Sequence, residues 1–200
     1  MVMPAVGILA LQGDVAEHAA AVRRAGARPV EVRLPAQLDA VDGLIIPGGE
    51  STAIGKLMAG WGLLEPLRER IAAGLPVWGT CAGAILLARH VLDALPGQPL
   101  LESMDITVRR NAFGRQLQSF TTTLDVPAIG GPPFQAVFIR APKIEAVGEG
   151  VEVLARLPDG TIVAARQGAL LASSFHPELT GDVRFHRLFL TTLRQPATVE

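Results

Sequence analysis

The chain contains a single cysteine, and the residues around it are those that a nucleophile needs. Cys81 is the middle residue of Gly79–Gly83, whose sequence is GTCAG, and it lies between apolar stretches at 75–79 and 82–90. A G-x-nucleophile-x-G sequence between a strand and a helix is typical of a nucleophile elbow, where a sharp turn projects the reactive side chain. The N-terminus of the following helix would favour a thiolate. A buried structural cysteine is the alternative interpretation.

A cysteine nucleophile needs a base, and the chain offers four histidines, His18, His90, His176 and His186. His176 differs from the others because it directly follows an apolar stretch, 169–175, that is typical of a strand. In a doubly wound sheet, catalytic groups collect at the carboxyl ends of the strands, so we expect His176 beside Cys81. The other three histidines are interpreted as helix-surface or boundary residues, with His18 a candidate for a docking face.

Glu178 follows His176 by two residues, with Pro177 between them. Its carboxylate can turn back to the imidazole, since proline breaks regular structure at this point. Cys81, His176 and Glu178 would then act as nucleophile, base and orienting acid. A solvated acid in a loop is the alternative interpretation of Glu178.

A second glycine-rich turn, Pro47–Ser51 with the sequence PGGES, also lies between a predicted strand and a predicted helix. Adjacent glycines let backbone N–H groups approach a ligand closely. Attack by cysteine on an acyl carbon creates an oxyanion that needs such donors, and the candidates are the N–H groups of Gly49 and Ala82. The alternative is an ordinary turn in which Ser51 is the N-cap of the next helix.

The elements that would position these residues alternate between strand and helix in the first half of the chain. Apolar runs predict strands at 6–11, 29–33, 43–46 and 75–79, and helices at 14–24, 51–58, 64–73 and 82–90. Asp14 is the expected N-cap of the first helix, and Gly26 its expected stop. This alternation is typical of a parallel sheet with helices on both faces.

The second half of the chain predicts short strands with hairpin-like turns and a closing helix. The strands fall at 106–110, 119–124, 136–140, 151–156, 162–165 and 169–174, and the helix at 181–193. We therefore expect an α/β three-layer sandwich with a mostly parallel central sheet, helices on both faces and a smaller antiparallel portion. Because 200 residues suit one domain, residues 1–200 are expected to form a single domain.

Composition excludes several classes of protein. With 49% hydrophobic residues there is material for a full core, and a net charge of −1 without a basic run argues against nucleic-acid binding. Nothing resembles a signal peptide, and no apolar run approaches the roughly 18 residues of a membrane span, so we expect a cytoplasmic protein. Because one cysteine and scattered histidines give no plausible ligand cluster, no metal and no cofactor is expected.

The three motifs, in this chain order, resemble those of the class I glutamine amidotransferases. Within that class the chain is similar to the glutaminase subunits of pyridoxal 5'-phosphate synthase, through the blocks Leu11–Gly13, Gly48–Thr52, Arg110–Gln116, Phe138–Pro142 and Phe175–Thr180. These blocks span residues 11–180 and are together highly specific. One departure is Ala53, where the family more often has a second threonine, and it touches no catalytic residue.

The resemblance implies site residues and an activity. It implies the catalytic triad Cys81, His176 and Glu178, and it implies a glutamine site at Gly49, Glu50, Ser51, Arg110, Ile139 and Arg140, with Gln12 beside it. An arginine suits the α-carboxylate of glutamine, and Glu50 could hold the α-ammonium group. From the sequence alone, either arginine could instead be a surface cation. The implied reaction is hydrolysis of L-glutamine to L-glutamate and ammonia through a γ-glutamyl thioester.

The resemblance also implies a partner, because ammonia released into water becomes ammonium and loses its nucleophilicity. That partner would be a barrel-shaped synthase subunit, in a large hetero-oligomer, that makes pyridoxal 5'-phosphate. Two alternatives stay open. One is a glutaminase of another pathway on the same scaffold, feeding histidine, purine or anthranilate synthesis. The other is a non-catalytic binding or scaffolding protein that keeps the elbow as a relic of its fold.

Overall fold

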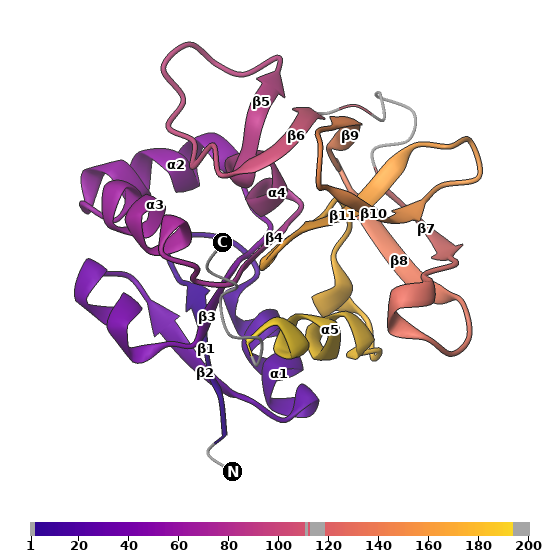
Figure 1. The fold of residues 1–200 in the computed structure, drawn as a ribbon, viewed down its shortest axis with the longest axis horizontal. Helices are drawn as coiled ribbons and strands as arrows, with labels where there is room; N and C mark the ends of the chain where they lie inside the picture. The colour runs from indigo at the N-terminus through magenta and orange to yellow at the C-terminus, as the bar shows by residue number, and fades with distance from the viewer. Residues whose placement is uncertain (1–2, 111, 113–118, 194–200) are drawn as a thin grey trace.

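The computed structural model describes residues 3–110, 112 and 119–193. Its centre is a run of adjacent parallel strands in the order β2 (Arg28–Val32), β1 (Ala5–Leu9), β3 (Gly43–Ile46), β4 (Val77–Thr80) and β12 (Leu170–Ser173). Because these strands are parallel, their carboxyl ends lie along one edge of the sheet (Figure 1).

Beyond β12 the sheet continues with antiparallel pairings. The order runs through β11 (Ile162–Gln167), β9 (Lys143–Val147), β6 (Met104–Arg109) and β5 (Ala88–Leu92), and β10 (Glu152–Arg156) pairs with β11. Only the last pair, β5 with β6, is again parallel in this part of the described sheet. A separate two-stranded antiparallel sheet is formed by β7 (Ser119–Leu124) and β8 (Phe134–Ile139).

Helices cover both faces of the parallel centre, which makes three layers (Figure 1). One face carries α1 (Val15–Ala25) and α5 (Arg184–Thr192), and the other carries α2 (Ser51–Gly60), α3 (Leu64–Ala72) and α4 (Ala82–Leu87). Three short 3-10 helices complete the described elements, η1 (Pro35–Ala40), η2 (Pro127–Ile129) and η3 (Pro177–Leu179). The expected α/β sandwich is confirmed. No described helix is long and apolar enough to cross a membrane.

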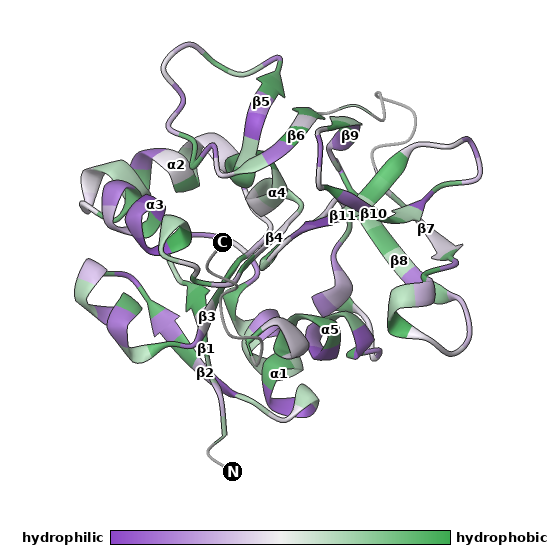
Figure 2. Ribbon diagram, viewed as in Figure 1, coloured by the Kyte–Doolittle hydropathy of each residue, from purple (hydrophilic) through white to green (hydrophobic). Residues whose placement is uncertain are grey.

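The two faces of the sheet have separate cores, because successive strand residues point in opposite directions. Val77 packs into the core under α2, α3 and α4, whereas its neighbour Trp78 packs into the core under α1 and α5. Strands buried on both faces must be apolar throughout, which explains the continuous apolar runs of the sequence. Figure 2 shows this as mainly hydrophobic colour on β1 and β3, whereas α3 and α5 carry both colours.

Most predicted elements are found within a few residues of their expected limits, but one predicted helix ends early, and the strands β5 and β9 were not predicted. The predicted helix 82–90 ends at Leu87, because residue 88 is extended and the carbonyls of Leu86 and Leu87 accept hydrogen bonds from Leu101 and Ser103 instead. The chain then enters β5. Strand β9 was not predicted, and it begins directly after Pro142.

Aromatic side chains join α5 to the β7–β8 hairpin and to the segment that follows β12. Phe185 is fully buried, with ring centroids 4.9 Å from Phe134 and 5.0 Å from Phe175. Phe185, Leu188 and Phe189 all pack inward from α5. This cluster lies next to His176 along the chain and supports its strand end.

Replacement of Phe185 by alanine should lower the free energy of unfolding by about 3–5 kcal/mol, because it leaves a cavity in a fully packed aromatic cluster. Urea denaturation measured by circular dichroism provides the test. Leu34, which is 53% exposed, is the matched control, and Leu34→Ala should change the value by less than about 0.5 kcal/mol. Equal effects of the two variants would contradict this account of the core.

Candidate active site

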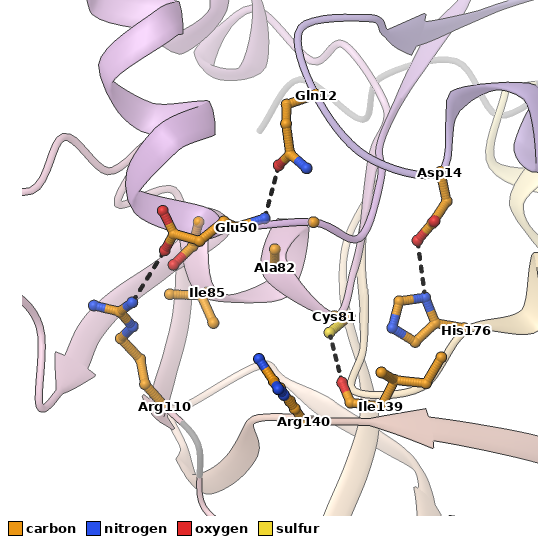
Figure 3. A pocket seen from close by; sticks show the side chains of 12 residues that line it. Gln12, Asp14, Glu50, Cys81, Ala82, Ile85, Arg110, Ile139, Arg140 and His176 are labelled. Atoms are coloured by element: carbon orange, nitrogen blue, oxygen red, sulfur yellow. Dashed lines mark hydrogen bonds and ion pairs between the residues drawn. The ribbon is translucent and has the colours of Figure 1, made fainter. Parts of the chain in front are cut away.

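Four neighbouring strands end at the same place, and the residues that follow them line one cavity. The cavity has a volume of about 610 Å³, and it is lined by Gln12 after β1, Gly49 after β3, Cys81 after β4 and His176 after β12 (Figure 3). That volume is ample for a free amino acid. Parallel topology, rather than nearness in sequence, brings these residues together.

Cys81 occupies a strained turn between β4 and α4. Its φ is 48° and its ψ is −102°, a region that non-glycine residues rarely adopt. Its backbone N–H donates a hydrogen bond of 2.8 Å to the carbonyl of Ser173 on β12. The turn also needs Gly83, since a Cβ there would overlap the carbonyl of Ile46. This is the strand–turn–helix geometry of a nucleophile elbow.

His176 and Glu178 lie in direct contact, and both are only 4% exposed. The Nδ1 atom of His176 is 2.8 Å from Oε1 of Glu178, and it is also 3.2 Å from Oδ2 of Asp14. Because Nδ1 carries at most one hydrogen, the two carboxylates share one donor. The other ring nitrogen, Nε2, is buried and has no hydrogen-bond partner among the described residues. The ring lies next to Cys81 in Figure 3.

The surroundings of His176 favour its charged form. Burial disfavours the imidazolium, but the neighbouring Asp14, Cys81 and Glu178 outweigh burial and raise the pKa of His176 from 6.5 to about 12. Burial raises the pKa of Glu178 above its ordinary value, against the opposing influence of its contact with His176. An imidazole placed beside a cysteine sulfur is the arrangement found in cysteine hydrolases.

Asp14 was predicted only as a helix cap, and the structure gives its side chain another partner. It does begin α1, but its carboxylate caps no helix N–H and instead faces His176. The predicted stop at Gly26 is confirmed, with the left-handed φ of 95°. A sequence signal for the contact was available, since Asp14 directly follows the Gln12-Gly13 turn at the end of a predicted strand.

Two histidines that were predicted to be surface or boundary residues are buried instead. His18 on α1 is 0% exposed and His186 on α5 is 1% exposed, and both lie behind the triad. They point inward because α1 and α5 pack against each other over β4. His90 is exposed as expected, but it lies on β5 and not on a helix.

The two residues that carry the predicted oxyanion donors lie in the lining of the cavity. Gly49 and Ala82 both line the cavity, and the Gly49 N–H has no hydrogen-bond partner among the described residues. The N–H of Ala82 belongs to the first turn of α4, where no intrahelical acceptor exists. Gly48 is required beside them, because a Cβ there would overlap the ring of His176. Its carbonyl accepts a hydrogen bond of 3.2 Å from the N–H of Asp14.

The start of α2 differs from the prediction that Ser51 caps it. Glu50 is the cap, and its carboxylate accepts hydrogen bonds of 3.0 Å from the N–H of Thr52 and 2.8 Å from that of Ala53. A glutamate has the reach to cap this helix, and the Ser51 hydroxyl is occupied by Gln98 at 3.2 Å. Burial opposes ionisation, but these backbone bonds and Arg110 hold the pKa of Glu50 below its ordinary value.

The other residues of the predicted glutamine site also reach the cavity (Figure 3). Arg110 is 3.3 Å from Oε1 of Glu50, so a cation and an anion stand side by side. Arg140 has a φ of 44°, and its side chain points towards the cavity from the end of β8. Gln12 accepts a hydrogen bond of 2.7 Å from the N–H of Glu50, and the Ile139 carbonyl lies 3.8 Å from the Cys81 sulfur. Of the Arg110–Gln116 block, residues 111 and 113–116 lie outside the described residues.

Sequence spacing predicted no cluster of metal ligands, but the fold assembles one candidate group. Ligand atoms of Asp14, His176 and Glu178 lie within 4.8 Å of one another. Both carboxylates in this group contact Nδ1 of His176, and that nitrogen cannot hold a proton and a metal ion at once. The shared hydrogen bond accounts for the cluster without an ion.

The fold and this site together define a glutamine amidotransferase of the class that uses a cysteine elbow. A model of the SNO glutamine amidotransferase family matches residues 8–195, and the chain belongs to that family.

Relatives cover nearly the whole chain. It is 61% identical over 191 residues to the pyridoxal 5'-phosphate synthase subunit PdxT of Frankia alni, covering 96% of each chain. It is 62% identical over 186 residues to the protein of the same name from Herpetosiphon aurantiacus, covering 92% of this chain and 98% of that one. A solved structure described as a glutamine amidotransferase is 51% identical, with a TM-score of 0.89 over 94% of this chain and 98% of that chain.

The raised pKa of His176 makes the stability of the fold depend on pH. Between the ordinary value of 6.5 and about 12, the folded chain holds a proton that the unfolded chain releases. The free energy of unfolding should therefore fall as pH rises, by at most about 1.4 kcal/mol per pH unit from this group. His176→Gln should make the decline between about pH 7 and about pH 10 shallower in urea denaturation. The exposed His90→Gln variant should keep the original slope, and parallel curves for all three proteins would contradict the assignment.

Proposed function

We propose that the chain hydrolyses L-glutamine to L-glutamate and ammonia, with Cys81, His176 and Glu178 as its catalytic triad. The observation that carries this proposal is the 2.8 Å contact between Nδ1 of His176 and Glu178, which leaves Nε2 without another partner beside the Cys81 sulfur. Nucleophile, base and orienting acid then follow one another in series. Membership in a glutamine amidotransferase family supports the choice of glutamine as substrate.

In the proposed reaction, the Cys81 thiolate attacks the side-chain carboxamide carbon of glutamine. The tetrahedral oxyanion binds to the N–H groups of Gly49 and Ala82. His176, charged at rest, gives its Nε2 proton to the leaving ammonia, and a γ-glutamyl thioester remains on Cys81. The neutral imidazole then takes a proton from water, and the resulting hydroxide attacks the thioester. Glutamate leaves, and the thiolate–imidazolium pair is restored.

Charged groups that line the cavity suit the α-carboxylate and the α-ammonium group of the amino acid. Arg110 and Arg140 are the candidates to hold the α-carboxylate, and Arg140 is the more exposed of the two. Glu50 is the candidate for the α-ammonium group, because it stays ionised and still has lone pairs free after it caps α2. Ser51, Ile139 and Gln12 complete the proposed glutamine site.

The ammonia needs a protected route to an acceptor, because ammonium in water is not a nucleophile. Relatives that are about 60% identical are named as subunits of pyridoxal 5'-phosphate synthase, and we propose that this chain supplies ammonia to such a synthase. This assignment disfavours a glutaminase of another pathway. The barrel shape of the partner, the large hetero-oligomer and the cytoplasmic location stay predictions.

Cys81→Ala should reduce glutamine turnover by at least about 10³-fold, because no other group can form the thioester. Glutamate release by the purified chain, alone and with its synthase subunit, measures this. His90→Gln, which changes an exposed residue outside the cavity, serves as the control. A glutamine-like diazoketone should label Cys81 selectively in the unchanged chain. Turnover that survives in Cys81→Ala, or a Cys81 that does not react, would favour the non-catalytic alternative.

Turnover should also rise when the synthase subunit is added. The Gly48 carbonyl is tied to the start of α1, so docking near α1 could reorient the Gly48–Gly49 peptide and complete the oxyanion site. One missing oxyanion donor reduces the rate by about 10²–10³-fold, which is the largest activation expected. An unrelated protein at the same concentration is the control. Equal turnover with and without the synthase subunit would contradict this mechanism of activation.

A further inference from the structure

Two buried histidines lie behind the triad, on the side away from the cavity. His18 Nδ1 is 3.2 Å from His186 Nε2, and His18 Nε2 is 3.1 Å from the hydroxyl of Thr80 and 3.3 Å from Oε2 of Glu178. The side chains of His18 and Glu178 are both 0% exposed. The proposed mechanism does not use either histidine.

The second oxygen of Glu178 depends on this contact. Oε1 is bound by His176, but Oε2 is buried and makes no regular hydrogen bond with any described residue. It lies 3.3 Å from His18 Nε2. A buried carboxylate oxygen without compensation is strongly unfavourable, so the state of His18 matters to Glu178.

The positions of the hydrogens follow from which atoms lack partners. His186 Nδ1 is buried and has no partner among the described residues. A bare nitrogen at this position is less unfavourable than a buried N–H without an acceptor, so Nδ1 carries no hydrogen. His186 then carries its hydrogen on Nε2 and donates to His18 Nδ1. His18 in turn must carry its hydrogen on Nε2, where it faces Thr80 and Glu178. The opposite assignment would leave one buried donor unpaired and place a lone pair against the carboxylate.

Both histidines are neutral in this arrangement. Burial, together with repulsion between a protonated His18 and the neighbouring His186 and His176, lowers the pKa of His18 well below 6.5. Burial, together with the charge of Arg24, lowers the pKa of His186 to about 3. Neither ring therefore gains a proton at the pH at which the enzyme works. His186 then sets the direction of the hydrogen bond between the two rings.

We propose that His18 is a positioning residue for glutamine hydrolysis: its Nε2–H edge, which bonds the Thr80 hydroxyl, faces the second oxygen of Glu178 at 3.3 Å, and His186 fixes the tautomer that makes this possible. His18 touches neither substrate nor the reacting atoms, and it acts through Glu178 on the orientation of the His176 ring. The inference rests on the proposed function, because Glu178 must orient the catalytic base for His18 to influence the rate.

Two amide substitutions at position 18 separate positioning from simple packing. The longer side chain of His18→Gln places an amide N–H near the former Nε2, whereas the shorter amide of His18→Asn reaches only the former Nδ1 position. His18→Asn should lower kcat for glutamine by at least about 10-fold with KM within about 2-fold, and His18→Gln should stay within about 3-fold of the unchanged chain. Equal kcat for the two variants, or the reverse order, would overturn the proposal.

Controls distinguish this inference from the proposed function. Kinetics are measured with the full chain and its synthase subunit, and thermal unfolding is measured for each variant. If the unchanged chain is active and Cys81→Ala is not, the proposed function stands, and the ratio between His18→Gln and His18→Asn decides the role of His18. If the unchanged chain has no turnover, the proposed function fails and the role of His18 fails with it.

A second measurement needs no folded variant. Nitrogen-15 spectra of labelled histidines in the unchanged chain report which ring nitrogen carries the hydrogen. The proposal requires hydrogen on Nε2 of both His18 and His186. Hydrogen on Nδ1 of His18 would place a lone pair against Glu178 and would overturn the proposal even if every substitution at position 18 failed to fold.

Discussion

The hydrogen bond between His176 and Glu178 is the interaction on which the rest of the site depends. At 2.8 Å and almost without exposure to water, it joins two groups that each prefer to be neutral when buried. The surrounding elements compensate for that burial: Asp14 from the start of α1 shares the same nitrogen, and His18 from one turn further along α1 faces the other carboxylate oxygen. Helix α1 therefore packs against the site as well as against the sheet.

Much of the fold followed from the sequence because its strands are buried on both faces. Continuous apolar runs such as Gly43–Ile46 are hard to place anywhere except in a parallel sheet, and that topology alone put Cys81 and His176 at one edge. The end of α4 was not predictable in the same way. Residues 82–88 are uniformly buried, so no periodicity marks the point where tertiary hydrogen bonds replace the helix.

The candidate site was predictable where chemistry restricts the residue type, and less so where packing decides. Cys81, His176 and Glu178 stand in short motifs, and all three meet in the structure. The burial of His18 and His186 could not be read from their helices, because it depends on how α1 and α5 approach each other over Trp78. Likewise, capping of α2 by Glu50 instead of Ser51 reflects a choice between two adjacent residues that are both capable of it.

The backbone conformation of Cys81 sets its proposed catalytic role against the stability of the fold. With a φ of 48°, the backbone at this position is one that glycine adopts more readily than any other residue. Replacement of Cys81 by glycine would relieve that strain, so a screen that rewarded thermostability alone would select a protein without the proposed nucleophile.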